Sequence, residues 1–278
     1  MLVKLAYLHD VDATSLLMLR MLISLPFFIG LLIYFGRNDS NSFAQLKRHK
    51  WSIMLLGLMG YYIASLLDLV GLQYIDASLE RIIIFIYPTF VIILSYLFLG
   101  QNAKFSQLIA ILLAYLGIMI AFYGNMAINQ GQQLALGGTF VIGSAFFYSI
   151  YLVGSQAIIT KINSRVYNAA AMITACIAIL VHNAVINGFN LLEFSMWVYI
   201  YAFLMAILAT VLPSFLIVEG IKIIGANNSS IIGTIGPVAT IALATLLLGE
   251  HLNSTQIIGS ALVIGGVLYL VMHKTKKT

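Results

Sequence analysis

Long apolar runs, each close to the thickness of a lipid bilayer, limit what this chain can fold into. A helix needs about 20 predominantly apolar residues to cross the hydrocarbon core of a membrane. Short polar or Gly-containing breaks separate such runs here, and we predict spans near residues 15–35, 51–71, 81–99, 105–123, 136–158, 169–187, 196–218, 230–248 and 255–272. The chain is therefore expected to be an all-α integral membrane protein.

Composition excludes the soluble alternative. Apolar residues make up 62% of the chain and charged residues only 8%, whereas soluble domains carry about 25% charged residues. A net charge of +5 could indicate a nucleic-acid partner, but the basic residues occupy short loops and the C-terminal tail, as juxtamembrane residues do. We expect the lipid bilayer to be the partner and nucleic acid not to be one.

The distribution of Lys and Arg predicts orientation, because basic residues accumulate in short cytoplasmic loops. One set of alternating segments contains Arg37, Lys47, Arg48, Lys50, Lys104, Lys161, Arg165, Lys222, Lys274, Lys276 and Lys277. The other set contains only Arg81. We predict a multi-pass protein of the cell (inner) membrane with a cytoplasmic C-terminus. A cleavable signal peptide is the competing interpretation of the N-terminus, but no convincing cleavage site follows the first run.

An internal repeat becomes visible when the sequence is shifted by 149 residues. Residues 71–107 then align without a gap with residues 220–256. The matched pairs are Gly71 with Gly220, Ala77 with Ala226, Pro88 with Pro237, Gly100 with Gly249, Gln107 with Gln256 and, beyond this stretch, Gly117 with Gly266. The charge distribution puts the loop at Gly71 outside and that at Gly220 inside, so the copies have opposite orientation. Inverted-topology repeats are typical of secondary transporters.

The repeat also predicts the division of the chain. A first repeat covers residues 1–123, an external connection 124–135, a second repeat 136–272 and a basic cytoplasmic tail 273–278. The second repeat has five spans, whereas the first has four full spans and a short apolar stretch, Met1–Leu8. By comparison with the second repeat, we expect one span to be missing at the N-terminal end, which leaves about nine.

Several segments resemble the EamA-like branch of the drug/metabolite transporter superfamily. They are DATSLLMLRMLISLPF, ASLERIIIFIYP followed by LFLG, SAFFYSIYLVGS, and IGANNSSIIGTIGPVATIALATLLLGE followed by IIGSALVIGGVLYL. The resemblance implies two five-helix repeats in a ten-helix fold, and export of small metabolites, amino acid-like compounds or drugs by alternating access. It also implies last helices that can support a homodimer. Two departures are Gln101, where the first repeat usually has the Glu seen as Glu250, and the absence of most of the first helix, which lines the central cavity in the family.

Asp68 is the strongest single candidate for a functional residue. A charged side chain deep in a span costs about 2.5–3.5 kcal/mol on insertion scales, so it needs a partner or water. Tyr61 and Ser65 share its helical face, and Arg20 and Arg81 are the candidate counter-charges. A structural ion pair and a substrate or proton-coupling site are equally compatible with this pattern.

Pro88 and Pro237 occupy equivalent positions within two spans, where each removes a backbone hydrogen bond and bends its helix. Matched interruptions in an inverted repeat favour a lining role at the central cavity over a packing kink. Thr234 lies at helical spacing from Pro237 and can contribute a hydroxyl. Glu80 and Arg81 open the span of Pro88, where an interfacial charge pair is favoured over recognition of an anionic or zwitterionic substrate by Arg81.

A further polar face combines Ser144, Tyr148, Tyr151 and Ser155, spaced by four, three and four residues. These side chains can either bind a substrate or bridge helices, and bridging is slightly favoured. Glu219 can pair with Lys222 near the cytoplasmic face and is a second candidate for ion coupling. His182 is expected to be a satisfied interfacial histidine.

The candidate residues predict a small-molecule transporter and no cofactor. The sequence has no Walker loop, no H-E-x-x-H metal motif and no G-x-S-x-G nucleophile elbow. The lone Cys176 lies in an apolar run and excludes an internal disulfide. An intramembrane enzyme and a non-transporting membrane subunit are the alternatives; the first would need His and carboxylate residues clustered at one depth.

Overall fold

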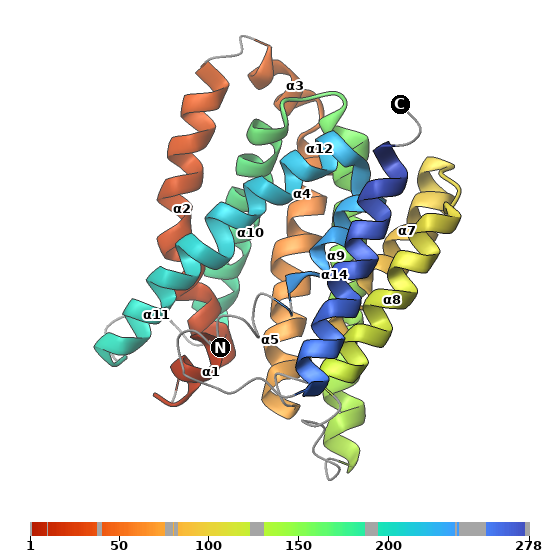
Figure 1. Cartoon of the computed structure of the whole chain (residues 1–278). Helices are drawn as coiled ribbons and strands as arrows, with labels where there is room; N and C mark the ends of the chain where they lie inside the picture. Colours follow the sequence, from red (N-terminus) through yellow and green to blue (C-terminus); the bar gives the residue numbers. More distant parts are fainter. Residues whose placement is uncertain are drawn as a thin grey trace.

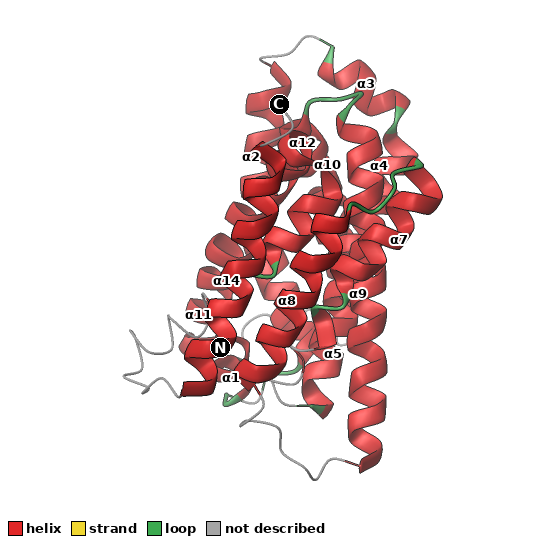
Figure 2. Cartoon of the chain, turned by 45° about the vertical axis from the view of Figure 1, so that its right-hand side comes forward, coloured by secondary structure: helices red, strands yellow, loops and turns green. Residues whose placement is uncertain are grey.

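The computed structural model describes residues 2–9, 11–37, 41–75, 80, 83–122, 131–186, 194–236, 238 and 254–275. Figure 2 shows helices joined by short loops and no strand within these ranges. The first repeat comprises α1 (Leu2–Tyr7), α2 (Ala13–Arg37), α3 (Ser42–Arg48), α4 (Lys50–Gly57), the π-helical segment η1 (Leu58–Ile63), α5 (Ala64–Tyr74), α7 (Tyr87–Leu99) and α8 (Phe105–Phe122). The second comprises α9 (Gly131–Ile159), α10 (Ser164–Ile186), α11 (Met196–Ala206), the π-helical segment η3 (Ile207–Val211), α12 (Leu212–Gly233) and α14 (Ser254–Thr275).

The predicted all-α membrane fold is confirmed. Within the described ranges, the helical segments long and apolar enough to cross a membrane are Thr14–Arg37, Lys50–Tyr74, Ala135–Ile159, Ser164–Ile186 and Met196–Gly233. Tyr87–Leu99, Phe105–Ile120 and Ile257–Met272 form shorter apolar helices. Large apolar side chains such as Phe98, Phe105 and Val185 point outward, which suits a surface covered by lipid tails.

The two repeats share the same irregularities at the same positions. The π-helical segments begin at Leu58 and Ile207, 149 residues apart, and the same interval separates Phe105 and Ser254, the first residues of α8 and α14. Equivalent helices pack against each other, α2 along α10 and α8 along α14. In Figure 1, α8 descends while α14 rises to the C-terminus. The opposite orientation of the two repeats, which the charge distribution predicted, is therefore also seen in the structure.

The long helix α9 covers α5 and η1 through small residues. A Cβ added at Gly71 would lie 2.7 Å from Val141 Cγ2, and one added at Gly60 would lie 2.3 Å from Tyr151 Cγ. The matching face of the second repeat differs: Leu216, the counterpart of Leu67, is 67% exposed. The short α1 packs on α11 and corresponds in register to the C-terminal part of α9.

A sharp reversal divides α12 at Gly225, whose φ of 81° and ψ of 163° are not helical. Positive φ is strained for residues with a Cβ, so glycine suits this position. Gln156 on α9 accepts a hydrogen bond from the Ala226 amide over 2.7 Å, which caps the helical segment that follows. The sequence predicted a break between residues 218 and 230; the structure places it at Gly225.

Candidate functional site

Four tyrosines form a cluster at the centre of the bundle, where both repeats meet. Tyr61 comes from η1, Tyr87 from α7, and Tyr148 and Tyr151 from α9. The ring centroids of Tyr61 and Tyr151 are 4.8 Å apart, those of Tyr148 and Tyr151 6.0 Å, and those of Tyr87 and Tyr148 5.4 Å. The Tyr61 and Tyr151 hydroxyls share a hydrogen bond of 3.1 Å. We call these residues the central tyrosine cluster.

The π-helical turn in η1 and the glycine within it place Tyr61 against α9. Gly60 has no side chain, so the Tyr151 ring can lie on the helix backbone at this point. A π turn contains one residue more per turn than the α-helix and is frequent at functional sites. In η3, the Thr210 hydroxyl donates to the Met205 carbonyl over 3.1 Å, five residues earlier.

The helix of Pro88 is interrupted just before the proline. The Ile86 amide bonds to the Ile83 carbonyl over 3.1 Å, and the Thr89 amide bonds to the Ile86 carbonyl over 3.0 Å. Both bonds join residues three positions apart rather than the four of an α-helix, and α7 has proline in its first turn. Pro88 thus begins a helix rather than bending one in its middle.

The second repeat shows the same turn, since the Ile235 amide bonds to the Ile232 carbonyl over 3.1 Å. Thr234 lies in this turn, fully buried, and its hydroxyl donates to the Ile231 carbonyl over 2.6 Å. Pro237, Arg81 and Glu250 lie outside the described residues.

Tyr87 joins the two interrupted helices directly. Its hydroxyl donates to the Ser230 carbonyl over 2.8 Å and occupies the space where Gly233 lacks a side chain. The Ser149 hydroxyl on α9 lies 3.0 Å from the Tyr87 carbonyl. Tyr87 was not among the residues predicted from the sequence; its place immediately before Pro88 was the available signal.

The polar face of α9 bridges several helices. Ser144 donates to the Ala64 carbonyl on α5 over 2.8 Å, and the hydroxyls of Ser155 and Tyr167 on α10 are 2.7 Å apart. The face therefore links α9 to both α5 and α10. Only Tyr148 of the four predicted residues keeps appreciable exposure.

Asp68 lies on α5, in the half of the bundle that carries α1. Arg20 on α2, one of the predicted counter-charges, interacts electrostatically with it. Tyr7 on α1 also lies within electrostatic range of Asp68 and Arg20; sequence reasoning missed it because it lies in the short stretch before the first full span. Ser65 is partly exposed one turn from Asp68.

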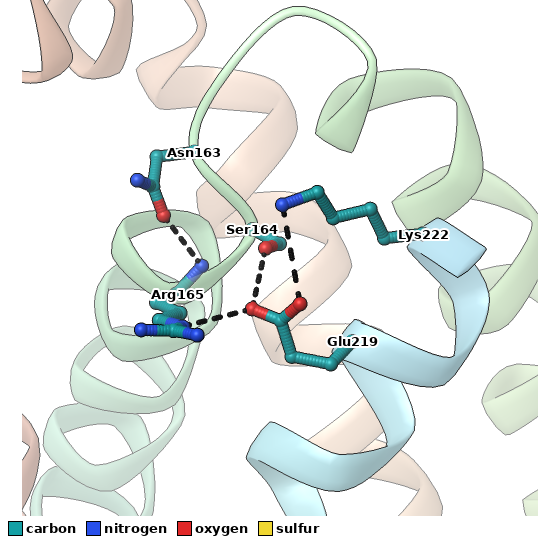
Figure 3. A network of polar contacts seen from close by, with 5 residues as sticks. All are labelled: Asn163, Ser164, Arg165, Glu219 and Lys222. Atoms are coloured by element: carbon teal, nitrogen blue, oxygen red, sulfur yellow. Dashed lines mark hydrogen bonds and ion pairs between the residues drawn. The ribbon is translucent and has the colours of Figure 1, made fainter.

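Glu219 lies at the opposite end of the bundle, in the network drawn in Figure 3. One carboxylate oxygen accepts hydrogen bonds from the Ser164 hydroxyl (2.8 Å) and Arg165 Nε (3.0 Å), and the other is 3.9 Å from Lys222 Nζ. The Arg165 and Lys222 side chains are about half exposed. The network joins the start of α10 to α12, and solvent weakens its ion pairs.

Two other predicted residues have different surroundings. Glu80 is 1% exposed, and His182 makes an edge contact with Tyr62, with centroids 5.5 Å apart. A separate cavity of about 290 Å³ is lined by Ile83, Ile86, Tyr115, Ile118, Met119 and Ile142. The Tyr115 hydroxyl points to Thr89 (2.6 Å) and the Ile86 carbonyl (3.3 Å), so this cavity offers mainly apolar contacts.

Two inverted helical repeats that meet through interrupted helices define a class, the membrane transporters built on internal repeats. The EamA-like transporter family matches this chain over residues 1–123 and 135–272. The chain belongs to that family, as its sequence motifs indicated.

Curated relatives agree with this assignment. The uncharacterized transporter YcbK of Bacillus subtilis is 29% identical over 274 residues, covering 97% of this chain and 85% of the relative. An uncharacterized transporter of Archaeoglobus fulgidus is 24% identical over 237 residues, covering 82% and 81%. A solved crystal structure superposes with a TM-score of 0.77 at 13% identity, over 95% of this chain and 90% of the other, and shows the shared fold.

Proposed function

We propose that this protein is a secondary transporter that exports small metabolites by alternating access between its two repeats. The observation that carries the proposal is the contact between the interrupted helices, in which Tyr87 of the first repeat bonds to Ser230 of the second. Rocking of one repeat against the other must alter contacts at this junction. The family assignment supports transport.

The proposed orientation places the C-terminus in the cytoplasm. Figure 1 shows α3, which carries Lys47 and Arg48, at the same end of the bundle as the C-terminus, and α1 at the opposite end. The Arg165 and Lys222 side chains belong to the network at the start of α10. Clustering of basic residues at one end supports the assignment of that end to the cytoplasm.

Asp68 is the proposed coupling residue, because a carboxylate within a span can exchange a proton between the two orientations of the site. Glu219 is the weaker candidate, since its partners are half exposed and fixed in an ion-pair network. Export driven by a proton gradient therefore depends on Asp68.

A proteoliposome assay tests this proposal. Vesicles containing the protein are loaded with a mixture of amino acids and small drugs, a pH gradient is imposed, and solute loss is followed by mass spectrometry. We expect gradient-dependent loss of particular solutes with the unmodified protein and none with Asp68→Asn. Equal loss from protein-free vesicles would contradict transport, and unchanged transport by a folded Asp68→Asn protein would contradict coupling through Asp68.

A further inference from the structure

A basic surface lies where α3 meets α4, at the end of the bundle that carries the C-terminus (Figure 1). Lys47 and Arg48 belong to the last turn of α3, Lys50 is the first residue of α4, and all three side chains are exposed. We call these three residues the basic corner. Within the part of the chain that the structure describes, no ion pair joins the corner to a carboxylate, unlike Arg165, which pairs with Glu219. The corner therefore presents uncompensated positive charge.

An aromatic side chain places the basic corner at the level of the lipid headgroups. Lys50 Nζ lies 5.2 Å from the centroid of the Trp51 ring, and Trp51 is 71% exposed. Tryptophan is enriched at membrane–water interfaces, where its ring lies at headgroup depth. Met54 and Leu55 are exposed apolar residues one turn further along α4. A lipid-facing apolar surface therefore begins directly beside the corner.

The backbone of the basic corner is held in place by neighbouring helices. A Cβ added at Gly36 would lie 2.7 Å from Phe43 Cζ, so the Phe43 ring of α3 lies against the end of α2. The His49 amide donates to the Gln45 carbonyl and the Ile53 amide to the His49 carbonyl, each over 3.0 Å. In addition, α3 packs on α10 and α4. Binding of a ligand therefore has to order side chains and not the backbone.

Charge complementarity selects an anionic ligand. A guanidinium can bind a phosphate through two hydrogen bonds, and an ammonium group attracts it as a point charge. Neither α3 nor α4 contains an acidic residue. Asp39, the nearest acidic residue in the sequence, lies outside the described residues, and its single charge would leave the corner positive.

The apolar surface beside the charges decides between two sources of phosphate. Free inorganic phosphate matches the charges but has no part that can contact Trp51 or the apolar residues after it. An anionic phospholipid matches both features, because its phosphate lies at headgroup depth and its acyl chains continue into the hydrocarbon core, where Met54 and Leu55 are exposed.

We propose that the basic corner and Trp51 form a binding site for an anionic phospholipid, in which the three basic side chains hold the phosphate and the acyl chains lie along Met54 and Leu55. The site depends on the membrane fold and not on the proposed transport function. Basic residues that only orient the chain in the membrane need no tryptophan beside them. Lys104 and Lys161, exposed residues in two other loops, serve as the comparison.

Fluorescence quenching by brominated lipids measures binding beside Trp51. The chain has two tryptophans, so Trp197→Phe reports on the corner alone, and Trp51→Phe reports on Trp197 of α11. Each full-length variant is reconstituted in bilayers of phosphatidylglycerol and phosphatidylcholine in which one of the two lipids is brominated. We expect phosphatidylglycerol to bind beside Trp51 at least about tenfold more tightly than phosphatidylcholine, and beside Trp197 with a preference below about twofold.

Charge removal tests whether the basic corner causes this preference. In the Trp197→Phe background, Lys47→Gln/Arg48→Gln should lower the preference at least about fivefold, because each basic residue near a lipid surface contributes up to about fivefold. Lys104→Gln/Lys161→Gln removes the same charge and should change it less than about twofold. Circular dichroism checks folding, and if the first double variant does not fold, Arg48→Gln alone decides, with an expected loss of about threefold.

Three results would overturn the site. Equal binding of the two lipids beside Trp51 would show no selection for an anionic headgroup. Equal losses in the two double variants would assign the preference to the overall charge of this end of the protein. Loss of the preference in inorganic phosphate, but not in chloride of the same ionic strength, would assign the basic corner to free phosphate.

Discussion

Substitution of Gly60 by alanine tests the packing on which the central tyrosine cluster depends. The added Cβ would lie 2.3 Å from Tyr151 Cγ and 2.5 Å from Tyr151 Cβ. Both atoms belong to the base of the side chain, so rotation of the ring cannot relieve the overlap. Either α9 moves away from η1 or Tyr151 leaves its position, and both outcomes disturb the 3.1 Å hydrogen bond between Tyr61 and Tyr151.

The expected magnitude combines three effects. Overpacking costs about 1–3 kcal/mol, and loss of the hydroxyl contact costs about 0.5–1.5 kcal/mol. Alanine in a helix interior is more stabilising than glycine by about 0.5–1 kcal/mol. Gly60→Ala should therefore lower the free energy of unfolding by about 0.5–4 kcal/mol and reduce transport, because Tyr61 is displaced.

Gly30→Ala is the matched control, since a Cβ at Gly30 on α2 meets nothing within 4 Å. It should keep the helix-propensity gain and raise stability by about 0.5–1 kcal/mol. The measurement is unfolding by denaturing detergent in mixed micelles, followed by tyrosine circular dichroism. A shift of the same sign and size for both variants would refute the packing argument.

Three other substitutions test separate parts of the structure. Tyr87→Phe removes the bond to the Ser230 carbonyl and should change the transport rate several-fold without unfolding the protein, whereas Tyr96→Phe, 58% exposed on the same helix, should not. Gly225→Ala forces a Cβ into φ 81° and should cost about 1–2 kcal/mol in detergent unfolding. Burial raises the pKa of Asp12 and hydrogen bonds from Ser15 and Thr14 lower it, with a net lowering. The stabilisation that Asp12 contributes is therefore present above its unfolded pKa and is lost as the pH falls through its folded pKa. Asp12→Asn should lack this loss when unfolding is measured between pH 5 and about 3.

The membrane spans and the repeat were predictable because their signals are local. Apolar runs have the length of a bilayer crossing, and a constant shift aligns Pro88 with Pro237 and Gly71 with Gly220. The electrostatic interaction of Arg20 with Asp68 could be anticipated for a related reason, since a charge within a span needs a partner. The short helix α3 was not predicted, because its seven residues are too few to cross a membrane and its Lys and Arg residues indicate only orientation.

The π-helical segments and the contacts between distant residues could not be predicted in this way. Nothing in LMGYYI distinguishes a π turn from an α turn; the arrangement depends on how Gly60 and Tyr151 pack. The bond from Tyr87 to Ser230 joins positions 143 residues apart. Such contacts depend on how helices far apart in the sequence are placed, whereas hydrophobic periodicity reports only on short windows of the sequence.

The two repeats have the same backbone breaks but different polar side chains at their ends. Glu219 and Arg165 form an ion pair at one end, and the residues 149 positions earlier, Val70 and Leu16, are apolar. Because its partners are half exposed, the pair at Glu219 is worth at most about 1 kcal/mol and is screened by salt. Arg20 and Asp68, near α1, are only partly exposed, so salt screens them less than Arg165 and Lys222. Under alternating access, the shared breaks allow both ends to open, whereas the unequal side chains make the energy of opening different for each end. Salt should therefore shift the conformational equilibrium toward opening at the Glu219 end.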